Sequence, residues 1–157
     1  MNQAIERLNR ELSAMSPPLE GSCLCGAVTY VVSAAPVWSG HCHCRACQRL
    51  SGAPFVSAFS VPAEAFSYQG EVGEFQRPTA SGNLVTTYHC TACGARMFAK
   101  STGNAAIVNV FATTLRDPRM FRPVGNVYLS DAANWIDPPP ALFNFQTMPP
   151  RADERSR

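Results

Sequence analysis

Hydrophobic and polar positions alternate along most of the chain, in short runs that favour β-strands. Val, Phe, Tyr and Thr are frequent in these runs, and Gly, Pro, Ser and Asn separate them. The pattern predicts strands at 27–34, 54–61, 72–76, 83–90, 96–100, 105–112 and 124–130. Long helical periodicity is absent from the middle of the chain, where 46–51 and 113–121 fit only single helical turns. We therefore expect a mostly β fold with antiparallel pairing.

The two ends of the chain depart from this alternation. Apolar side chains recur among charged ones in the first fifteen residues: Ile5, Leu8, Leu12 and Met15. They predict a short amphipathic helix that serves as a packing element or joins chains in an oligomer. SPPLEG at 16–21 would interrupt this helix. The other end is Pro-rich and then charged, and we expect its last eight residues, 150–157, to be disordered.

These segments divide the chain into an N-terminal helical extension (1–19), one central, mostly β domain (20–137) and a Pro-rich, charged tail (138–157). The 157 residues, 46% hydrophobic and 15% charged, are enough for one sizeable core. The net charge of +2 offers no large electrostatic footprint, so we expect no nucleic-acid partner. No apolar run reaches the ~18 residues of a membrane span, and no signal peptide is visible, which predicts a cytoplasmic protein without a membrane partner.

Cysteine carries the most specific signal in the sequence, because all seven cysteines fall in three tight clusters. These clusters are Cys23/Cys25, Cys42/Cys44/Cys47 and Cys90/Cys93. Each of the three histidines stands directly beside a cluster cysteine: His41, His43 and His89. An odd count without a secretory signal is not typical of a disulfide framework. The spacing predicts metal binding, and zinc is the metal we expect.

Two glycines divide the seven thiols into two sites. Gly26 directly follows Cys25 and Gly94 directly follows Cys93, and a glycine there permits the positive φ that turns backbone N–H groups toward the sulfurs. We therefore predict a closed structural site with four thiolate ligands: Cys23, Cys25, Cys90 and Cys93. In the alternative interpretation, Cys23 and Cys25 are buried apolar residues and only the later pair binds metal.

The remaining three thiols predict an open site. Alternate residues of an extended stretch share a face, so Cys42 and Cys44 point to one side and His41 and His43 to the other. A turn after Cys44 brings Cys47 to the same metal and leaves a fourth position free. We expect none of the histidines to be a ligand. A solvated turn position suits His43 better than the role of a catalytic base.

An open zinc ion with three thiolates favours sulfur chemistry over hydrolysis. The thiolates outweigh the charge of the ion, and such a negatively charged centre activates water poorly. It suits a soft fourth ligand, a substrate thiol, which loses its proton on coordination. The residues themselves therefore predict the activation of a sulfur nucleophile.

Three stretches resemble the glutathione-dependent formaldehyde-activating enzyme family, also called the centromere protein V/GFA-type domain. They are GSCLCGAVTY at 21–30, CHCRACQRLSGA at 42–53 and CTACG at 90–94, and the likeness covers about residues 20–136. The resemblance implies a β-tent-like fold of short antiparallel sheets with two zinc ions. One ion would be structural, on the four-cysteine set, and one catalytic, on Cys42, Cys44 and Cys47. It also implies a carbon–sulfur lyase that joins glutathione and formaldehyde to S-hydroxymethylglutathione.

Two hypotheses about function remain. The first is a zinc-dependent enzyme that adds a glutathione-like thiol to formaldehyde or another aldehyde, and the second is a non-catalytic, zinc-stabilised binding module. The roles of some side chains near the clusters stay open. Arg45, Arg49 and Arg96 would bind substrate carboxylates, or they would be solvated or balance the charge of the zinc–thiolate sites. Phe55 and Phe59 would wall a pocket or fill the core. His43 or a bound water would supply a proton, and His89 is expected to be an ordinary strand residue.

Overall fold

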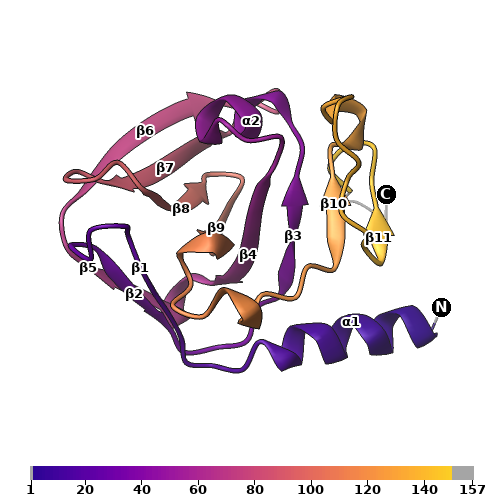
Figure 1. Ribbon diagram of the computed structural model, residues 1–157, viewed down its shortest axis with the longest axis horizontal. Coiled ribbons are helices and arrows are strands. Elements are labelled where there is room, and N and C mark those ends of the chain that lie inside the picture. Colours follow the sequence, from indigo (N-terminus) through magenta and orange to yellow (C-terminus); the bar gives the residue numbers. More distant parts are fainter. Residues whose placement is uncertain (1, 150–157) are drawn as a thin grey trace.

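The computed structural model describes residues 2–149, which form two β-sheets preceded by a helix (Figure 1). The helix α1 spans Asn2–Ala14. Three strands form a small antiparallel sheet in the order β1–β2–β5: β1 Leu19–Ser22, β2 Thr29–Val32 and β5 Phe66–Gln69. The prediction of a disordered end at 150–157 lies outside the described residues.

Within the described residues, the second sheet has eight strands in the order β11–β10–β3–β4–β9–β8–β7–β6. They are β3 Trp38–Cys42, β4 Val56–Pro62, β6 Val72–Pro78, β7 Leu84–Cys90, β8 Arg96–Ser101, β9 Asn104–Phe111, β10 Gly125–Val127 and β11 Phe143–Asn144. The sheet is antiparallel from β3 to β6. Figure 1 shows that it curls, with the helix α2 (Arg45–Ser51) at its top between the β6–β7 hairpin and β3.

The mostly β prediction is confirmed, and seven of the strands lie where the alternation predicts them: β2, β4, β6, β7, β8, β9 and β10. The helical turns predicted at 46–51 and 113–121 are also present, as α2 and as the 3₁₀ turns η2 (Ala112–Thr114) and η3 (Pro118–Met120). Two more 3₁₀ turns, η1 (Ala63–Ala65) and η4 (Leu129–Asp131), complete the described elements. The expectation of antiparallel pairing needs one correction, because β10 pairs in parallel with both β3 and β11.

The main core lies between the two sheets. Tyr30 of β2 is buried, as the alternation in TYVV requires, and joins one cluster with Phe59 and Phe98 of the larger sheet. Phe66 of β5 packs its ring 4.7 Å from that of Phe98, and Tyr68 packs at 4.9 Å. Such tilted aromatic pairs stabilise the fold beyond the area that they bury. The core therefore fixes the small sheet against the strands that carry the cysteines.

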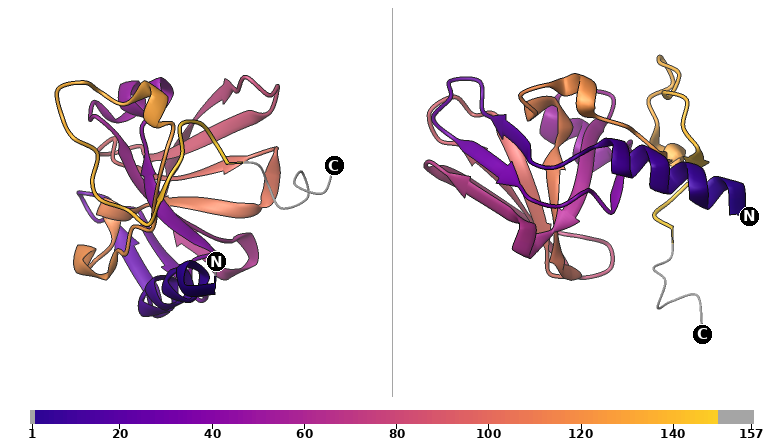
Figure 2. Two further views of the ribbon diagram at one scale, coloured as in Figure 1. Left: turned by 90° about the vertical axis from the view of Figure 1, so that its right-hand side faces the viewer. Right: turned by 90° about the horizontal axis from the view of Figure 1, so that it is seen from below.

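The helix α1 packs through its C-terminal end. Leu12 is 8% exposed, and Met15, just after the helix, belongs to the core cluster, whereas Ile5 is 50% exposed. Figure 2 shows α1 projecting beyond the two sheets along one side of the molecule. An oligomer formed through this helix stays a prediction. Among the described residues, no helix combines the length and the apolar character that crossing a membrane requires.

Candidate metal centres

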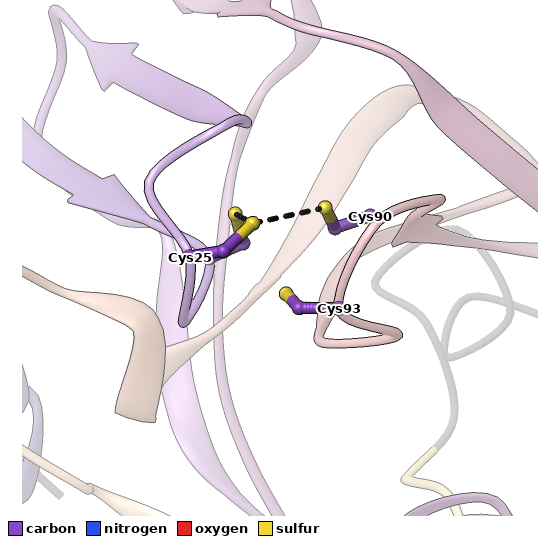
Figure 3. A group of neighbouring side chains, drawn as sticks. Cys25, Cys90 and Cys93 are labelled. Atoms are coloured by element: carbon purple, nitrogen blue, oxygen red, sulfur yellow. Dashed lines mark hydrogen bonds between the residues drawn. The ribbon is translucent and has the colours of Figure 1, made fainter.

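The first centre joins two turns that are far apart in the sequence. The sulfurs of its four cysteines all lie within 4.8 Å of one another: Cys23, Cys25, Cys90 and Cys93. The Sγ atom of Cys25 is 3.6 Å from that of Cys23 and 3.8 Å from that of Cys90. Figure 3 shows the sulfurs of Cys25, Cys90 and Cys93 turned toward a common point. The turn after β1 and the turn after β7 thus face each other.

Each turn has the backbone that its sequence predicts. Gly26 has φ +81° and Gly94 has φ +74°, in the left-handed region that favours glycine. Their N–H groups donate to the carbonyls of Cys23, at 3.2 Å, and of Cys90, at 2.9 Å. The N–H of Val28 donates to the Cys23 sulfur at 3.2 Å. The prediction that backbone N–H groups turn toward the sulfurs is therefore confirmed at Cys23.

The spacing of these sulfurs fits a tetrahedral metal ion. Zinc–sulfur bonds of about 2.3 Å place the sulfurs of a tetrahedral site about 3.8 Å apart. The sulfur–sulfur distances of 3.6 and 3.8 Å agree with this edge length, and all seven cysteines are free of disulfides. Cys25 is exposed, which does not suit a purely core-filling role. The geometry thus supports the four-cysteine set over the alternative interpretation.

The second centre is built on the start of α2. Cys42 ends β3, Cys44 caps the N-terminus of α2, and Cys47 lies in its first turn. Their sulfurs lie within 4.8 Å of one another, and the Cys47 N–H donates to the Cys44 sulfur at 3.4 Å. Across residues 2–149, no further His, Cys, Asp or Glu side chain joins this group. The three thiols could hold a metal ion with a position left open.

The three thiols of this centre shift one another's pKa values. The neighbouring thiols of Cys42 and Cys47 lower the pKa of Cys44 to about 2, and the nearby charge of Arg77 acts in the same direction. The thiols of Cys44 and Cys47, followed by burial, raise the pKa of Cys42. Cys42 alone would lower the pKa of Cys47, but Cys44 and burial raise it to about 12. The cluster therefore favours a thiolate at Cys44, the form that binds a metal ion.

His43 is not the solvated turn residue that the sequence analysis expects. Its side chain is 2% exposed, and its Nε2 bonds Asn126 Oδ1 at 3.0 Å. The Nδ2 of Asn126 donates to the carbonyl of Pro139 at 2.8 Å and to Asn144 Oδ1 at 2.9 Å. Both polar atoms of the Asn126 side chain therefore have hydrogen-bond partners. Because Oδ1 can only accept, the Nε2 of His43 must carry a proton. Strand β10 lies beside β3 in the sheet and also accepts the His43 N–H, at 3.0 Å, through the carbonyl of Val127.

His41 is buried in the same region. Its Nδ1 bonds Ser57 Oγ at 2.9 Å, its Nε2 is buried with no partner among the described residues, and the Phe55 ring lies 4.9 Å from the imidazole. Burial lowers the pKa of His41 to about 4, and the nearby His43 adds to the effect. A neutral imidazole at pH 7 follows. His89 lies in β7, and neither it nor the other two histidines joins a thiol cluster.

The structure resolves several of the open roles. Phe59 is fully buried in the core, and Phe55 packs 5.1 Å from His43 behind the three-cysteine centre. Arg45 and Arg49 are exposed, and Arg45 bonds Gln48 on its own helix. Arg96 lines a cavity of about 580 Å³ that also includes Cys23 and so adjoins the four-cysteine centre. None of these three arginines contacts the open thiols.

Sequence reasoning misses two side chains near the three-cysteine centre, Arg77 and Tyr128. The charge of Arg77 acts on Cys44 and Cys47, and burial followed by the thiols raises the pKa of Tyr128. Tyr128 follows Val127, the register partner of Cys42, and has the left-handed backbone φ 59°, ψ 42°. A bulky residue rarely adopts that conformation. No local motif marks either residue, because tertiary pairing alone places them here.

Together, the fold and the two thiol clusters define a small, mostly β protein built around cysteine metal centres. The family model of the glutathione-dependent formaldehyde-activating enzyme matches residues 18–131, and the chain belongs to this family. No curated protein matches the chain. A Rhodobacter sphaeroides protein of known crystal structure shares the fold, with a TM-score of 0.52 and 21% identity over 64% of this chain and 92% of that one.

Proposed function

We propose that the protein is a zinc-dependent carbon–sulfur lyase that adds a small, glutathione-like thiol to formaldehyde or another aldehyde. The observation that carries the proposal is the open group of three sulfurs on Cys42, Cys44 and Cys47, which no other described ligand completes. Membership of the glutathione-dependent formaldehyde-activating enzyme family supports the choice of a thiol and an aldehyde as substrates. A non-catalytic binding module would need no open position.

The two centres have different tasks in this proposal. Cys23, Cys25, Cys90 and Cys93 would hold a structural zinc ion, which ties the turn after β1 to the turn after β7. Cys42, Cys44 and Cys47 would hold the catalytic zinc ion. Zinc on this set would accept the substrate thiol at its fourth position and favour loss of the thiol proton at neutral pH.

The chain itself would supply rigidity and exclude water behind the thiols. The cap of α2 fixes Cys44 and Cys47 relative to each other through the Cys47 N–H. The hydrogen bond between His43 and Asn126 joins the chain between β3 and α2 to β10, and the Phe55 ring packs 5.1 Å from the His43 imidazole. These contacts would keep the three sulfurs in fixed positions. A fixed site can orient the thiol and the aldehyde relative to each other.

The addition balances in protons and electrons. The thiol sulfur forms a bond to the carbonyl carbon, and the carbonyl π pair moves to the oxygen. We assign to Tyr128 the proton that converts this alkoxide to a hydroxyl, since its phenol is protonated at neutral pH and lies near enough for the charges of Cys42, Cys44 and Cys47 to act on it after burial. His43 suits the task less, because its Nε2 is already bonded to Asn126. The proton released by the incoming thiol restores the phenol.

We place this chemistry in the cytoplasm. All seven cysteines are free thiols, and thiols of this kind persist in a reducing compartment.

The test follows ¹³C-labelled formaldehyde with glutathione by NMR, using zinc-loaded protein. Wild type is expected to accelerate formation of the hemithioacetal, and Cys44→Ser is expected to match the buffer rate while still holding the zinc ion of the four-cysteine centre. An acceleration that survives in Cys44→Ser would place the activity elsewhere. If wild type gives only the buffer rate with this thiol and aldehyde and with related ones, the binding module becomes the better account.

A further inference from the structure

Arg77 is a cation with one buried donor, its Nε, that no described residue accepts. It lies in β6, at the edge of the larger sheet, and it is half-buried between two exposed neighbours, Gln76 and Pro78. Its Nε is buried and has no hydrogen-bond partner among the described residues. Two exposed arginines, by contrast, form ion pairs: Arg116 with Glu20, and Arg119 with Asp117. A buried N–H without an acceptor is costly unless a ligand supplies one.

The register of the sheet places Arg77 on the same face as Cys42. Directly opposed residues of antiparallel strands share a face, and so do alternate residues of one strand. From β3 to β6, the opposed pairs on this face are Cys42–Val56, Ala58–Phe111, Asn109–Ala99, Ala99–Thr87 and Thr87–Phe75. Arg77 follows Phe75 at the alternate position of β6.

The curl of the sheet then brings β6 back toward α2. Figure 1 shows the β6–β7 hairpin and β3 on either side of this helix, which carries Cys47. The electrostatics agree with this approach. Beyond the larger effects of the neighbouring thiols, the Arg77 charge favours the thiolate forms of both Cys44 and Cys47. Arg77 therefore faces the open centre from the opposite edge of the sheet, and its Nε bonds none of the three sulfurs.

We propose that Arg77 binds a carboxylate of the substrate thiol when the sulfur of that thiol occupies the open position. The inference rests on the proposed function, and it deepens that function by naming the residue that recognises the carboxylate of the substrate thiol. A guanidinium suits this task because its planar donors match the two carboxylate oxygens. A second anchor also fixes the orientation of the thiol, which a single sulfur contact would leave free to rotate.

A role in charge balance alone would not explain the same observations. A cation that only offsets the thiolates needs no hydrogen-bond acceptor, and an exposed lysine would serve as well. Arg77 is instead half-buried, and its Nε is a buried donor that has no acceptor within residues 2–149. The two roles predict different outcomes when the carboxylate is removed from the ligand, because only direct recognition depends on it.

The experiment measures thiol binding on the cobalt-substituted protein, through the thiolate-to-metal absorption band. Glutathione is compared with its diethyl ester, which keeps the thiol and removes both carboxylates. Wild type is expected to bind glutathione about tenfold or more tightly than the ester. Arg77→Gln should abolish most of this preference, and Arg77→Lys should keep part of it. The matched control is Arg10→Gln on α1, across the molecule from α2 in Figure 1, which should keep the full preference.

Each outcome has a separate meaning. Equal binding of both thiols by wild type, or an unchanged preference in Arg77→Gln, would overturn the role of Arg77 and leave the proposed function standing. Indifference of the wild-type band to both thiols would contradict the proposed function itself. If Arg77→Gln does not fold, as judged by cobalt content and melting, Arg77→Lys decides: an undiminished preference overturns the inference, because the charge alone would then suffice.

Discussion

The sulfur of Cys25 lies 3.8 Å from that of Cys90, although 65 residues separate the two along the chain. Cys25 belongs to the turn after β1 of the small sheet, and Cys90 ends β7 of the large one. Closing a loop of this length carries an entropic cost that a structural metal can offset. The four-cysteine centre is therefore expected to stabilise the fold, whereas the three-cysteine centre, whose ligands lie within six residues of one another, closes no comparable loop.

The first prediction compares one cysteine from each centre. Cys93→Ser should prevent folding or soluble expression, because structural zinc contributes about 10–16 kcal/mol of binding energy, comparable to the whole stability of a domain. Cys44→Ser should stay folded and lose only thiol-linked activity. Thermal melts of the two zinc-loaded variants are the measurement, with wild type alongside. Two melts near that of wild type would show that the cysteines are not divided into a structural and a catalytic site.

The local features of both centres could be predicted from the sequence. The Gly26 and Gly94 turns follow from the residue that comes directly after each second cysteine, because positive φ is a property of the single position. The opposite directions of Cys42 and His43 follow from the alternation of an extended chain. The strand Trp38–Cys42 was harder to predict, because WSGHC lacks the run of β-branched residues that signals a strand.

The distant partners could not be predicted in this way. The buried His43 bonds Asn126, which lies 83 residues later in the chain. The parallel pairing of β10 with β3 brings the two residues together. The charge of Arg77 acts on Cys44 and Cys47, although four strands of the sheet, β4, β9, β8 and β7, separate β6 from β3. The spacing of residues along the chain predicts neither relation, since both depend on the pairing of strands that are far apart in the sequence.

The second prediction concerns the Asn126 hydrogen bonds. Asn126 is 1% exposed, and Asn126→Ala removes the hydrogen-bond partner of His43 Nε2 and that of the Pro139 carbonyl. An unsatisfied buried group costs about 1–3 kcal/mol, so a loss of roughly 2–4 kcal/mol in unfolding free energy is expected. Urea unfolding measures it. Asn144→Ala, at the exposed partner, is the control and should change stability by less than about 0.5 kcal/mol. Equal losses would contradict a special role for Asn126.

The third prediction is a pH dependence at Tyr30. Burial raises the pKa of this phenol to about 12, despite the opposing hydrogen bond with Thr114 Oγ1 at 3.1 Å. The unfolded value is about 10, so the stabilisation is complete below pH ~10 and is lost as the pH rises toward ~12. Tyr30→Phe should cost about 0.5–1.5 kcal/mol at pH 8.

The phenylalanine variant cannot lose a phenol proton. Its stability deficit relative to wild type should therefore shrink between pH 10 and pH 12, where wild type declines through Tyr30. Urea unfolding of both zinc-loaded proteins at a series of pH values gives the comparison. Two curves that stay parallel over this range would show that Tyr30 titrates equally in the folded and unfolded states.

The fourth prediction tests Tyr128 as the proton donor. Tyr128→Phe keeps the ring but removes the hydroxyl, and loss of a general acid is expected to lower kcat by about a hundredfold. The affinity for the thiol should stay the same, since the phenol has no part in binding the sulfur. Kinetics with formaldehyde and glutathione separate the two quantities. A rise in KM with kcat intact would instead make Tyr128 a binding residue.

The most direct test of the account is whether the centre of Cys42, Cys44 and Cys47 takes up the sulfur of an added thiol. The measurement is a titration of the fully cobalt-loaded protein with glutathione, followed by the thiolate-to-metal absorption band, with cobalt content determined on the same sample. The account predicts two metal ions per chain and a band that grows to saturation with one thiol per chain. It predicts no such growth in Cys44→Ser, which keeps only the four-cysteine centre. A band that no small thiol changes, with both centres loaded, would contradict the central claim.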